Sequence, residues 1–137
     1  MQPLLLDTHA AIWIVRNERL APRAAEAMNA AHQAAGTVFI SPITAWEVGL
    51  LASRNRLNLL MTPQRWFARL LEVPGMRLAE LSPDILIASS FLPGTPPRDP
   101  ADRIILATAR EHGATLITRD GLLLKYGQDG HVSTIAC

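Results

Sequence analysis

Residues 4–8 are Leu-Leu-Leu-Asp-Thr, an apolar run of strand length that ends directly at a carboxylate. The three leucines do not alternate with polar residues, and this pattern indicates a strand that is covered on both faces. A second run of this kind, Leu116-Ile117-Thr118, is followed by Arg119 and then by Asp120. Strands covered on both faces are typical of parallel sheets with helices on either side, so the two stretches predict an α/β fold.

Helix starts are marked by a repeated dipeptide, an oxygen-bearing residue followed by proline. The oxygen can accept a hydrogen bond from a free N–H of the first turn, and proline at the first helical position loses no needed donor. The first residues of the four pairs are Ser41, Thr62, Ser82 and Asp99. The helices predicted after them span residues 42–53, 63–73, 83–90 and 100–113. Three further helices are expected over residues 9–16, 22–34 and 121–125.

Apolar runs of strand length separate these helices, over residues 3–6, 38–40, 77–81, 115–118 and 132–135. Strands that alternate with helices predict a parallel sheet between helical layers, an α/β three-layer fold. The chain of 137 residues has the length of one domain and contains no repeat or dividing linker, so we expect a single domain over residues 1–137. The proline-rich residues 91–98 are expected to form an ordered surface loop.

The composition excludes several classes of protein. Hydrophobic residues make up 49% of the chain and charged residues only 18%, which excludes an intrinsically disordered protein. No apolar run approaches the roughly 18 residues that span a bilayer, and the first leucine run is too short for a signal-peptide core. The only cysteine, Cys137, leaves no intramolecular disulfide. We therefore expect a cytoplasmic protein with no membrane insertion.

Four of the twelve acids stand where an ordinary surface charge is not expected. Asp7 and Asp120 follow two predicted strands, at the sheet edge where open α/β folds bind ligands. Glu47 lies beside the apolar stripe of its helix and too far inside the helix to cap its N-terminus. Asp102 shares a helical face with Ile105. We expect the four carboxylates, from four separate segments, to meet at one edge of the sheet.

Each acid also has a structural explanation. Asp7 and Asp120 can cap the helices that follow them, and Asp99 with Asp102 forms nearly a capping box. Capping is the expected role of Asp99, whereas for Asp102 capping and a metal-binding or catalytic role are equally expected. Convergence favours a ligand site, because carboxylates gathered in one place repel one another unless cations neutralise them. Hard oxygen ligands of this kind suit Mg²⁺ or Mn²⁺.

A carboxylate cluster that holds divalent ions is suited to phosphodiester hydrolysis, because the metal activates water and stabilises the leaving oxygen. With the four acids neutralised, the 13 basic residues would outnumber the remaining acids, which suits a polyanionic substrate. Basic residues near the last two acids are candidate phosphate contacts, namely Arg98, Arg103, Arg119 and Lys125. For each of them an ordinary surface ion pair is the alternative.

The same segments resemble, in order and spacing, the PIN-domain ribonucleases, most closely the VapC-like toxins of bacterial type II toxin–antitoxin pairs. The resemblance covers essentially the whole chain and rests on residues 4–9, 40–47, 99–107 and 116–120. It implies a three-layer α/β/α fold around a parallel sheet and cleavage of RNA by an endonuclease that depends on Mg²⁺ or Mn²⁺. It also implies a homodimer and inhibition by a cognate antitoxin protein.

The resemblance assigns roles residue by residue. The three core acids of the family match Asp7, Glu47 and Asp102, and a fourth position, filled less strictly, matches Asp120. These four residues would be the catalytic metal ligands. The small hydroxyl residue after the first acid matches Thr8, and Asp99 would be an accessory acid or only a cap. The RNA contacts expected from charge alone, independently of the resemblance, are Arg98, Arg103 and Arg119.

A second function stays open at this point, that of a non-catalytic RNA-binding or regulatory module with the same fold. In such a module the acids would serve only as helix caps. The four histidines have no zinc-type spacing with cysteine and are expected to be surface or capping residues. Trp46 and the apolar residues of the first helix, Ile12, Trp13 and Val15, are expected to pack mainly in the core.

Overall fold

Five short parallel strands form one sheet in the order β3-β2-β1-β4-β5, in a computed structural model that describes residues 2–137. The strands are β1 (Leu4–Leu6), β2 (Val38–Ile40), β3 (Met76–Leu78), β4 (Thr115–Thr118) and β5 (Thr134–Ala136). The leucine run forms the central strand, where Leu5 pairs with Phe39 of β2 and with Leu116 of β4. All three leucines are buried, as their sequence pattern predicts.

Helices connect the strands, and the described residues contain α1 (Thr8–Val15), α2 (Pro22–Gln33), α3 (Pro42–Ser53), α4 (Pro63–Glu72), α5 (Pro83–Ala88), α6 (Pro100–His112) and α7 (Gly121–Gln128). The four residues predicted to cap helices before proline all do so through a side-chain oxygen. At the other end of α6, Gly113 has a φ of 59°, a left-handed conformation that glycine adopts without steric cost. The helix starts were therefore predictable from local chemistry alone.

Two strands lie slightly away from their predicted positions. The third was expected over residues 77–81, but it spans Met76–Leu78, because its pairs with β2 run from Met76 opposite Val38 to Leu78 opposite Ile40. The last was expected over residues 132–135, but it spans Thr134–Ala136. Pairing with a neighbouring strand sets these limits, and hydrophobicity along the chain does not reveal that register.

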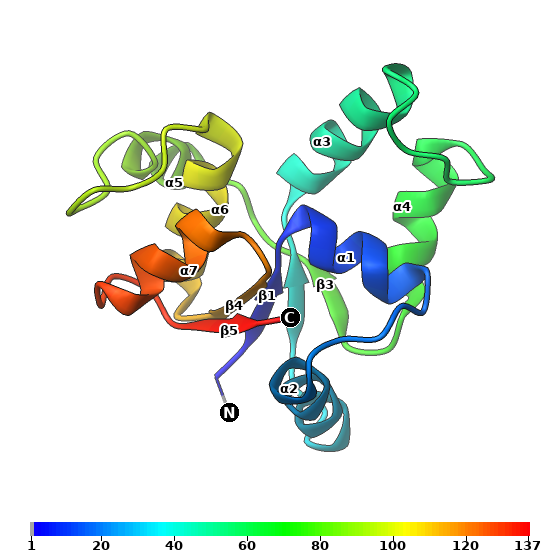
Figure 1. Ribbon diagram of the computed structural model, residues 1–137, viewed down its shortest axis with the longest axis horizontal. Coiled ribbons are helices and arrows are strands. Elements are labelled where there is room, and N and C mark those ends of the chain that lie inside the picture. Colours follow the sequence, from blue (N-terminus) through cyan, green and yellow to red (C-terminus); the bar gives the residue numbers. More distant parts are fainter. Residues whose placement is uncertain (1) are drawn as a thin grey trace.

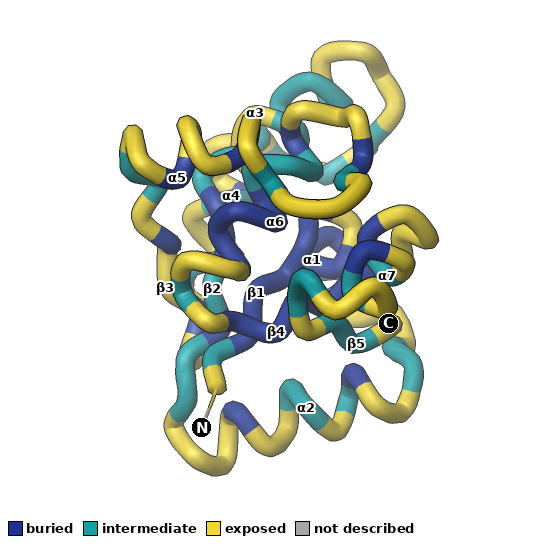
Figure 2. The backbone as a smooth tube through the Cα atoms, turned by 90° about the vertical axis from the view of Figure 1, so that its left-hand side faces the viewer, coloured by how far each residue is buried: buried dark blue, intermediate teal, exposed yellow. Residues whose placement is uncertain are grey.

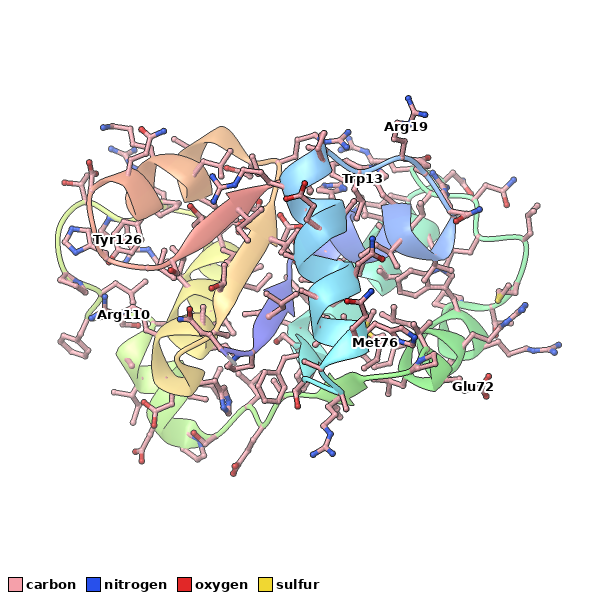
Figure 3. The ribbon with its side chains drawn as sticks, turned by 90° about the horizontal axis from the view of Figure 1, so that it is seen from below. Trp13, Arg19, Glu72, Met76, Arg110 and Tyr126 are labelled. Atoms are coloured by element: carbon pink, nitrogen blue, oxygen red, sulfur yellow. The ribbon has the colours of Figure 1, made fainter. Side chains whose placement is uncertain are left out.

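Two cores cover the two faces of the sheet. Leu4, Leu6 and Val38 pack with α1, α2 and α4 on one face, whereas Leu5 and Leu116 pack with α6 and α7 on the other. In Figure 1, α6 and α7 lie to the left of the sheet and α1 and α4 to the right, while Figure 3 shows α2 from below. Buried backbone runs through β1, β4 and α6 in Figure 2. The three-layer α/β/α architecture is confirmed.

Trp46 does not pack in the core as expected, since 57% of its surface is exposed. It lies two residues from each of the buried Thr44 and Val48 on α3, and two residues along a helix turn a side chain to nearly the opposite side. On α1 the expectation holds for Ile12, which is buried, whereas Trp13 and Val15 are only partly buried. Between residues 2 and 137, no helix combines the length and apolar character that a membrane crossing needs.

Candidate functional site

Five carboxylates line one cavity of about 390 Å³ that opens beyond the carboxyl ends of β1 and β4. They are the four predicted acids and the predicted accessory acid, namely Asp7, Glu47, Asp102, Asp120 and Asp99. The acids come from four segments that lie far apart in the sequence. The parallel topology explains their meeting, because it brings the carboxyl ends of β1 and β4 to the same edge of the sheet.

Asp7 is fixed by hydrogen bonds to both of its carboxylate oxygens. Oδ1 accepts a hydrogen bond of 2.8 Å from the backbone N–H of Ala10 and so caps α1, and Oδ2 accepts one from the hydroxyl of Thr118. Only 5% of the Asp7 surface is exposed, and this burial raises the pKa of its carboxyl, although the hydrogen bonds from Thr118 and Ala10 act against the rise. Asp7 is therefore a buried acid with a fixed orientation.

Thr118 connects two of the acids. Its hydroxyl donates to Asp7 and accepts a hydrogen bond of 3.0 Å from the backbone N–H of Asp120. The Asp120 carboxylate in turn caps α7, with Oδ1 accepting from the N–H groups of Leu122 at 2.8 Å and Leu123 at 3.2 Å. The end of β4 thus positions an acid on each side of one buried hydroxyl.

Glu47 enters the cavity from α3 and is held by the residue that follows the first acid. The Thr8 hydroxyl lies 2.6 Å from Glu47 Oε1 and donates to it, and the Thr44 hydroxyl lies 3.1 Å from that of Thr8. Burial raises the pKa of Glu47, the hydrogen bond from Thr8 opposes this, and the nearby Asp99 adds to the rise. The expected hydrogen-bonding role of Thr8 is therefore present in the structure.

Asp102 differs from its neighbours because its side chain makes no hydrogen bond within residues 2–137. Asp99 caps α6 by accepting from the backbone N–H of Ala101 at 3.3 Å, but the reciprocal bond that would complete a capping box is missing from the described residues. Burial and then the charge of Asp99 raise the pKa of Asp102 to about 7, with Asp120, Glu47 and Asp7 adding to the rise. A capping role for Asp102 is thus excluded, which leaves the metal-binding role as the remaining expectation.

Capping and convergence occur together in this site. Asp7, Asp99 and Asp120 each use Oδ1 to cap a helix, which leaves the other oxygen for a different partner. Across the part of the chain that the structure describes, no three acidic, histidine or cysteine side chains form a ready-made metal-binding group. The acids share one cavity, where burial and then the charges of the other acids raise the pKa of Asp102, but they are not gathered around one point.

The basic residues predicted near the site have separate environments. Arg119 lines the carboxylate cavity, whereas Arg98 and Lys125 line a neighbouring hollow of about 610 Å³. Arg103 donates from Nε to the carbonyl oxygen of Pro97 at 2.6 Å and so holds the proline-rich loop. Lys125 forms the expected kind of surface ion pair, at 3.6 Å from Asp129.

His9 and Trp13 also line the cavity, and neither was predicted as a site residue. Their rings are stacked with centroids 6.0 Å apart, as residues four apart on a helix can be. The i,i+4 spacing of two aromatic rings, directly after an acid that ends a strand, was a signal available in the sequence. His9 is exposed, as expected, but it stands at the rim of the site.

Comparisons with known proteins agree with this architecture. The sequence pattern of the PIN domain family matches residues 4–128. Ribonuclease VapC22 of Mycobacterium tuberculosis is 35% identical over 121 residues, which cover 88% of each chain. A chain of VapBC2 from Rickettsia felis, crystallised with a promoter DNA fragment, superposes with a TM-score of 0.67 at 15% identity and 98% coverage of both chains. A chain of DNA-bound VapBC from Salmonella typhimurium gives 0.67 at 20% identity, with 99% of this chain and 98% of that one covered.

Proposed function

Since this chain belongs to the PIN domain family, we propose that it is a metal-dependent endoribonuclease that hydrolyses RNA phosphodiester bonds. The observation that carries the proposal is the convergence of five carboxylates in one cavity at the strand ends. Acids whose only role was to cap helices would not need to share a cavity, where burial and then the charges of the other acids raise the pKa of Asp102. The 35% identity to a ribonuclease supports RNA as the substrate.

The donor set suits a hard divalent cation such as Mg²⁺ or Mn²⁺, because every candidate ligand offers carboxylate oxygen. The residues that would hold the ion are Asp7, Glu47, Asp102 and Asp120. A bound ion would supply an activated water and a positive charge at the leaving oxygen. Burial is the main cause of the raised pKa of Asp102, and the repulsion from the other acids, which adds to it, is an unfavourable interaction that a cation relieves.

The residues of this chain orient the acids for that task. The N-terminus of α1 and the Thr118 hydroxyl fix Asp7, and Thr8 holds the Glu47 carboxylate at 2.6 Å. With its pKa raised to about 7, the Asp102 carboxyl is partly protonated at neutral pH, and a bound cation would favour its charged form. No serine, cysteine or histidine nucleophile is needed for hydrolysis by an activated water.

The partners proposed for this enzyme follow the same comparisons. The architecture shared with VapBC chains supports a role as the toxin of a toxin–antitoxin pair, with a cognate antitoxin as the inhibitor. A homodimer as the assembled form is proposed from the family resemblance alone. An RNA substrate and a single cysteine that forms no internal disulfide suit a cytoplasmic site of action. The non-catalytic RNA-binding module is the alternative that the next experiment separates.

The experiment measures cleavage of labelled RNA by the purified chain with Mg²⁺, with Mn²⁺ and with EDTA. We expect cleavage with either metal, none with EDTA, and a loss of at least about a hundredfold in Asp7→Asn. Glu72→Gln is the matched control, because Glu72 is an exposed acid on α4, outside the cavity and labelled in Figure 3. Full metal-dependent cleavage by folded Asp7→Asn would contradict the assignment, and RNA binding without any cleavage would favour the non-catalytic module.

A further inference from the structure

Arg119 is the basic residue that lines the carboxylate cavity. It lies between β4 and α7, next to the capping Asp120 and one residue after Thr118. An arginine so close to several acids would be expected to form an ion pair with one of them. Within residues 2–137, however, Lys125–Asp129 is the ion pair that forms, and Arg119 takes part in none.

Two other contacts hold the Arg119 side chain. Its Cζ lies 3.7 Å from the centroid of the Trp13 ring, so the guanidinium stacks on the indole face. Its Nε donates a hydrogen bond of 3.0 Å to the backbone oxygen of Cys137. Three segments, α1, the β4–α7 connection and the end of the last strand, therefore fix one guanidinium at the edge of the cavity.

Trp13 is itself well supported. Its ring packs partly against the core on the α1 face of the sheet, and it stacks on His9 with centroids 6.0 Å apart. The indole thus offers Arg119 a firm platform, and the stacking leaves the donors at the edge of the guanidinium unobstructed.

The consequence is a positive charge that the neighbouring acids do not neutralise. An arginine paired with Asp7 or Asp120 would donate its hydrogen bonds to that carboxylate, and the pair would carry no net charge. Here the guanidinium forms no ion pair with an acidic side chain among residues 2–137, and its recorded hydrogen bonds go to Cys137. Such a planar set of donors matches the oxygens of a phosphate group.

The other predicted RNA contacts are less well placed for this role. Arg103 commits Nε to the Pro97 carbonyl, and Arg98 lines the neighbouring hollow. We infer that Arg119 binds a phosphate of the substrate RNA next to the carboxylate cavity, and that Trp13 is the positioning residue that holds it away from the acids. This inference rests on the proposed function, because it names how that site binds its polyanionic substrate.

The test measures binding of a fluorescein-labelled single-stranded oligoribonucleotide of mixed sequence, at several salt concentrations with Ca²⁺ in place of Mg²⁺. The logarithm of the association constant falls linearly with the logarithm of the salt concentration. Removing one phosphate contact makes this slope shallower by about 0.7 for single-stranded RNA. We expect that decrease in Arg119→Gln, with binding weakened about tenfold. Arg77→Gln is the matched control, because Arg77 is an exposed residue of the edge strand β3, which β2 and β1 separate from β4.

A pair of Trp13 variants separates positioning from packing. Trp13→Phe keeps an aromatic face and should retain most of the binding, whereas Trp13→Leu keeps apolar volume only and should resemble Arg119→Gln. The double variant Trp13→Leu/Arg119→Gln should bind no more weakly than Arg119→Gln, because the two residues act through one contact. In Mg²⁺, the Arg119→Gln and Trp13→Leu changes should raise KM for RNA cleavage and leave kcat within about twofold.

Several outcomes would overturn the inference. An unchanged salt dependence in Arg119→Gln, accompanied by a lower Tm, would show that the residue only anchors the chain at Cys137. Equal binding by Trp13→Phe and Trp13→Leu would remove the positioning role of the indole. If the wild-type chain binds RNA without cleaving it, the proposed catalysis fails and the salt dependence still decides the role of Arg119. If the wild-type chain binds no RNA, both proposals fail.

Discussion

The Thr8 hydroxyl donates a hydrogen bond of 2.6 Å to Glu47 Oε1 and thereby connects the start of α1 with the middle of α3. Thr8 directly follows Asp7, so one pair of adjacent residues supplies an acid and orients a second acid 39 positions further along the chain. The buried Thr44 hydroxyl, 3.1 Å from that of Thr8, completes the chain of contacts. The geometry of the cavity therefore depends on hydroxyl groups as well as on carboxylates.

Thr8→Val tests this dependence, because valine keeps the shape of threonine but removes the hydroxyl. We expect the free energy of unfolding to fall by about 1 kcal/mol, measured by urea denaturation at pH 7.5. The pKa of Glu47 should rise further, since the hydrogen bond that now lowers it is lost. Thr8→Val should also weaken RNA cleavage, whereas Thr8→Ser retains the hydroxyl donor and should cleave RNA like the wild-type chain. A serine variant as impaired as the valine variant would show that the methyl group matters instead.

The raised pKa of Asp102 predicts how stability depends on pH when no metal is present. Between about pH 4 and pH 7 the native carboxyl binds a proton that the unfolded chain releases, so stability should fall as the pH rises through this range. Because Asp102 is only partly buried, water screens part of the repulsion, and we expect a loss of about 1–2 kcal/mol. Tm measured in EDTA from pH 4 to pH 8 gives the result.

Asp102→Asn provides the control for this pH dependence. The amide carries no charge, so the variant should be more stable than the wild-type chain at pH 8 in EDTA and should lose less stability between pH 4 and pH 7. A wild-type chain that becomes more stable across that range would show that other groups dominate the titration.

Metal binding should offset the loss of folding stability that the charged Asp102 carboxylate causes at neutral pH. A ligand that binds only the folded chain stabilises it by about 2.7 kcal/mol at a hundred times its Kd. We therefore expect Mn²⁺ to raise the Tm at pH 7.5 in the wild-type chain and in Glu72→Gln, but much less in Asp7→Asn and Asp102→Asn. Equal increases in all four proteins would place the bound ion outside the carboxylate cavity.

Replacing two helical glycines by alanine should change the free energy of unfolding in opposite directions. A Cβ on Gly49 of α3 would meet nothing within 4 Å, so Gly49→Ala should stabilise the chain by about 0.5–1 kcal/mol through higher helix propensity. A Cβ on Gly127 of α7 would come within 2.7 Å of Thr134 Cγ2 in β5. Gly127→Ala should therefore destabilise the chain by about 1–3 kcal/mol, and paired urea denaturation curves compare the two.

Much of the fold was predictable because its signals are local. Capping residues before proline define helix starts through hydrogen bonds within one turn, and the leucines of β1 reveal a strand buried on both faces. The limits of β3 and β5 were displaced because the register with a neighbouring strand decides them. Trp46 was placed wrongly because the hydrophobicity of α3 varies little around its circumference, and only packing shows which side faces the core.

The candidate site was predictable at the level of residues but not of contacts. Acids that end strands of a parallel sheet must approach one edge, so the positions of Asp7 and Asp120 follow from topology. The hydrogen bond that joins Thr118 to Asp7 links residues 111 positions apart and depends on the register of β1 with β4. For the same reason, no local pattern shows that Arg119 stacks on Trp13.

Asp102 lacks a capping hydrogen bond, whereas Asp7, Asp99 and Asp120 each secure the first turn of a helix. Replacing any of those three by alanine removes a helix cap as well as a carboxylate, so stability and activity change together, whereas asparagine can still accept the capping hydrogen bond. Replacing Asp102 removes negative charge without releasing a backbone N–H. Asp102→Asn is therefore the variant in which we expect a loss of RNA cleavage to be separable from a loss of stability.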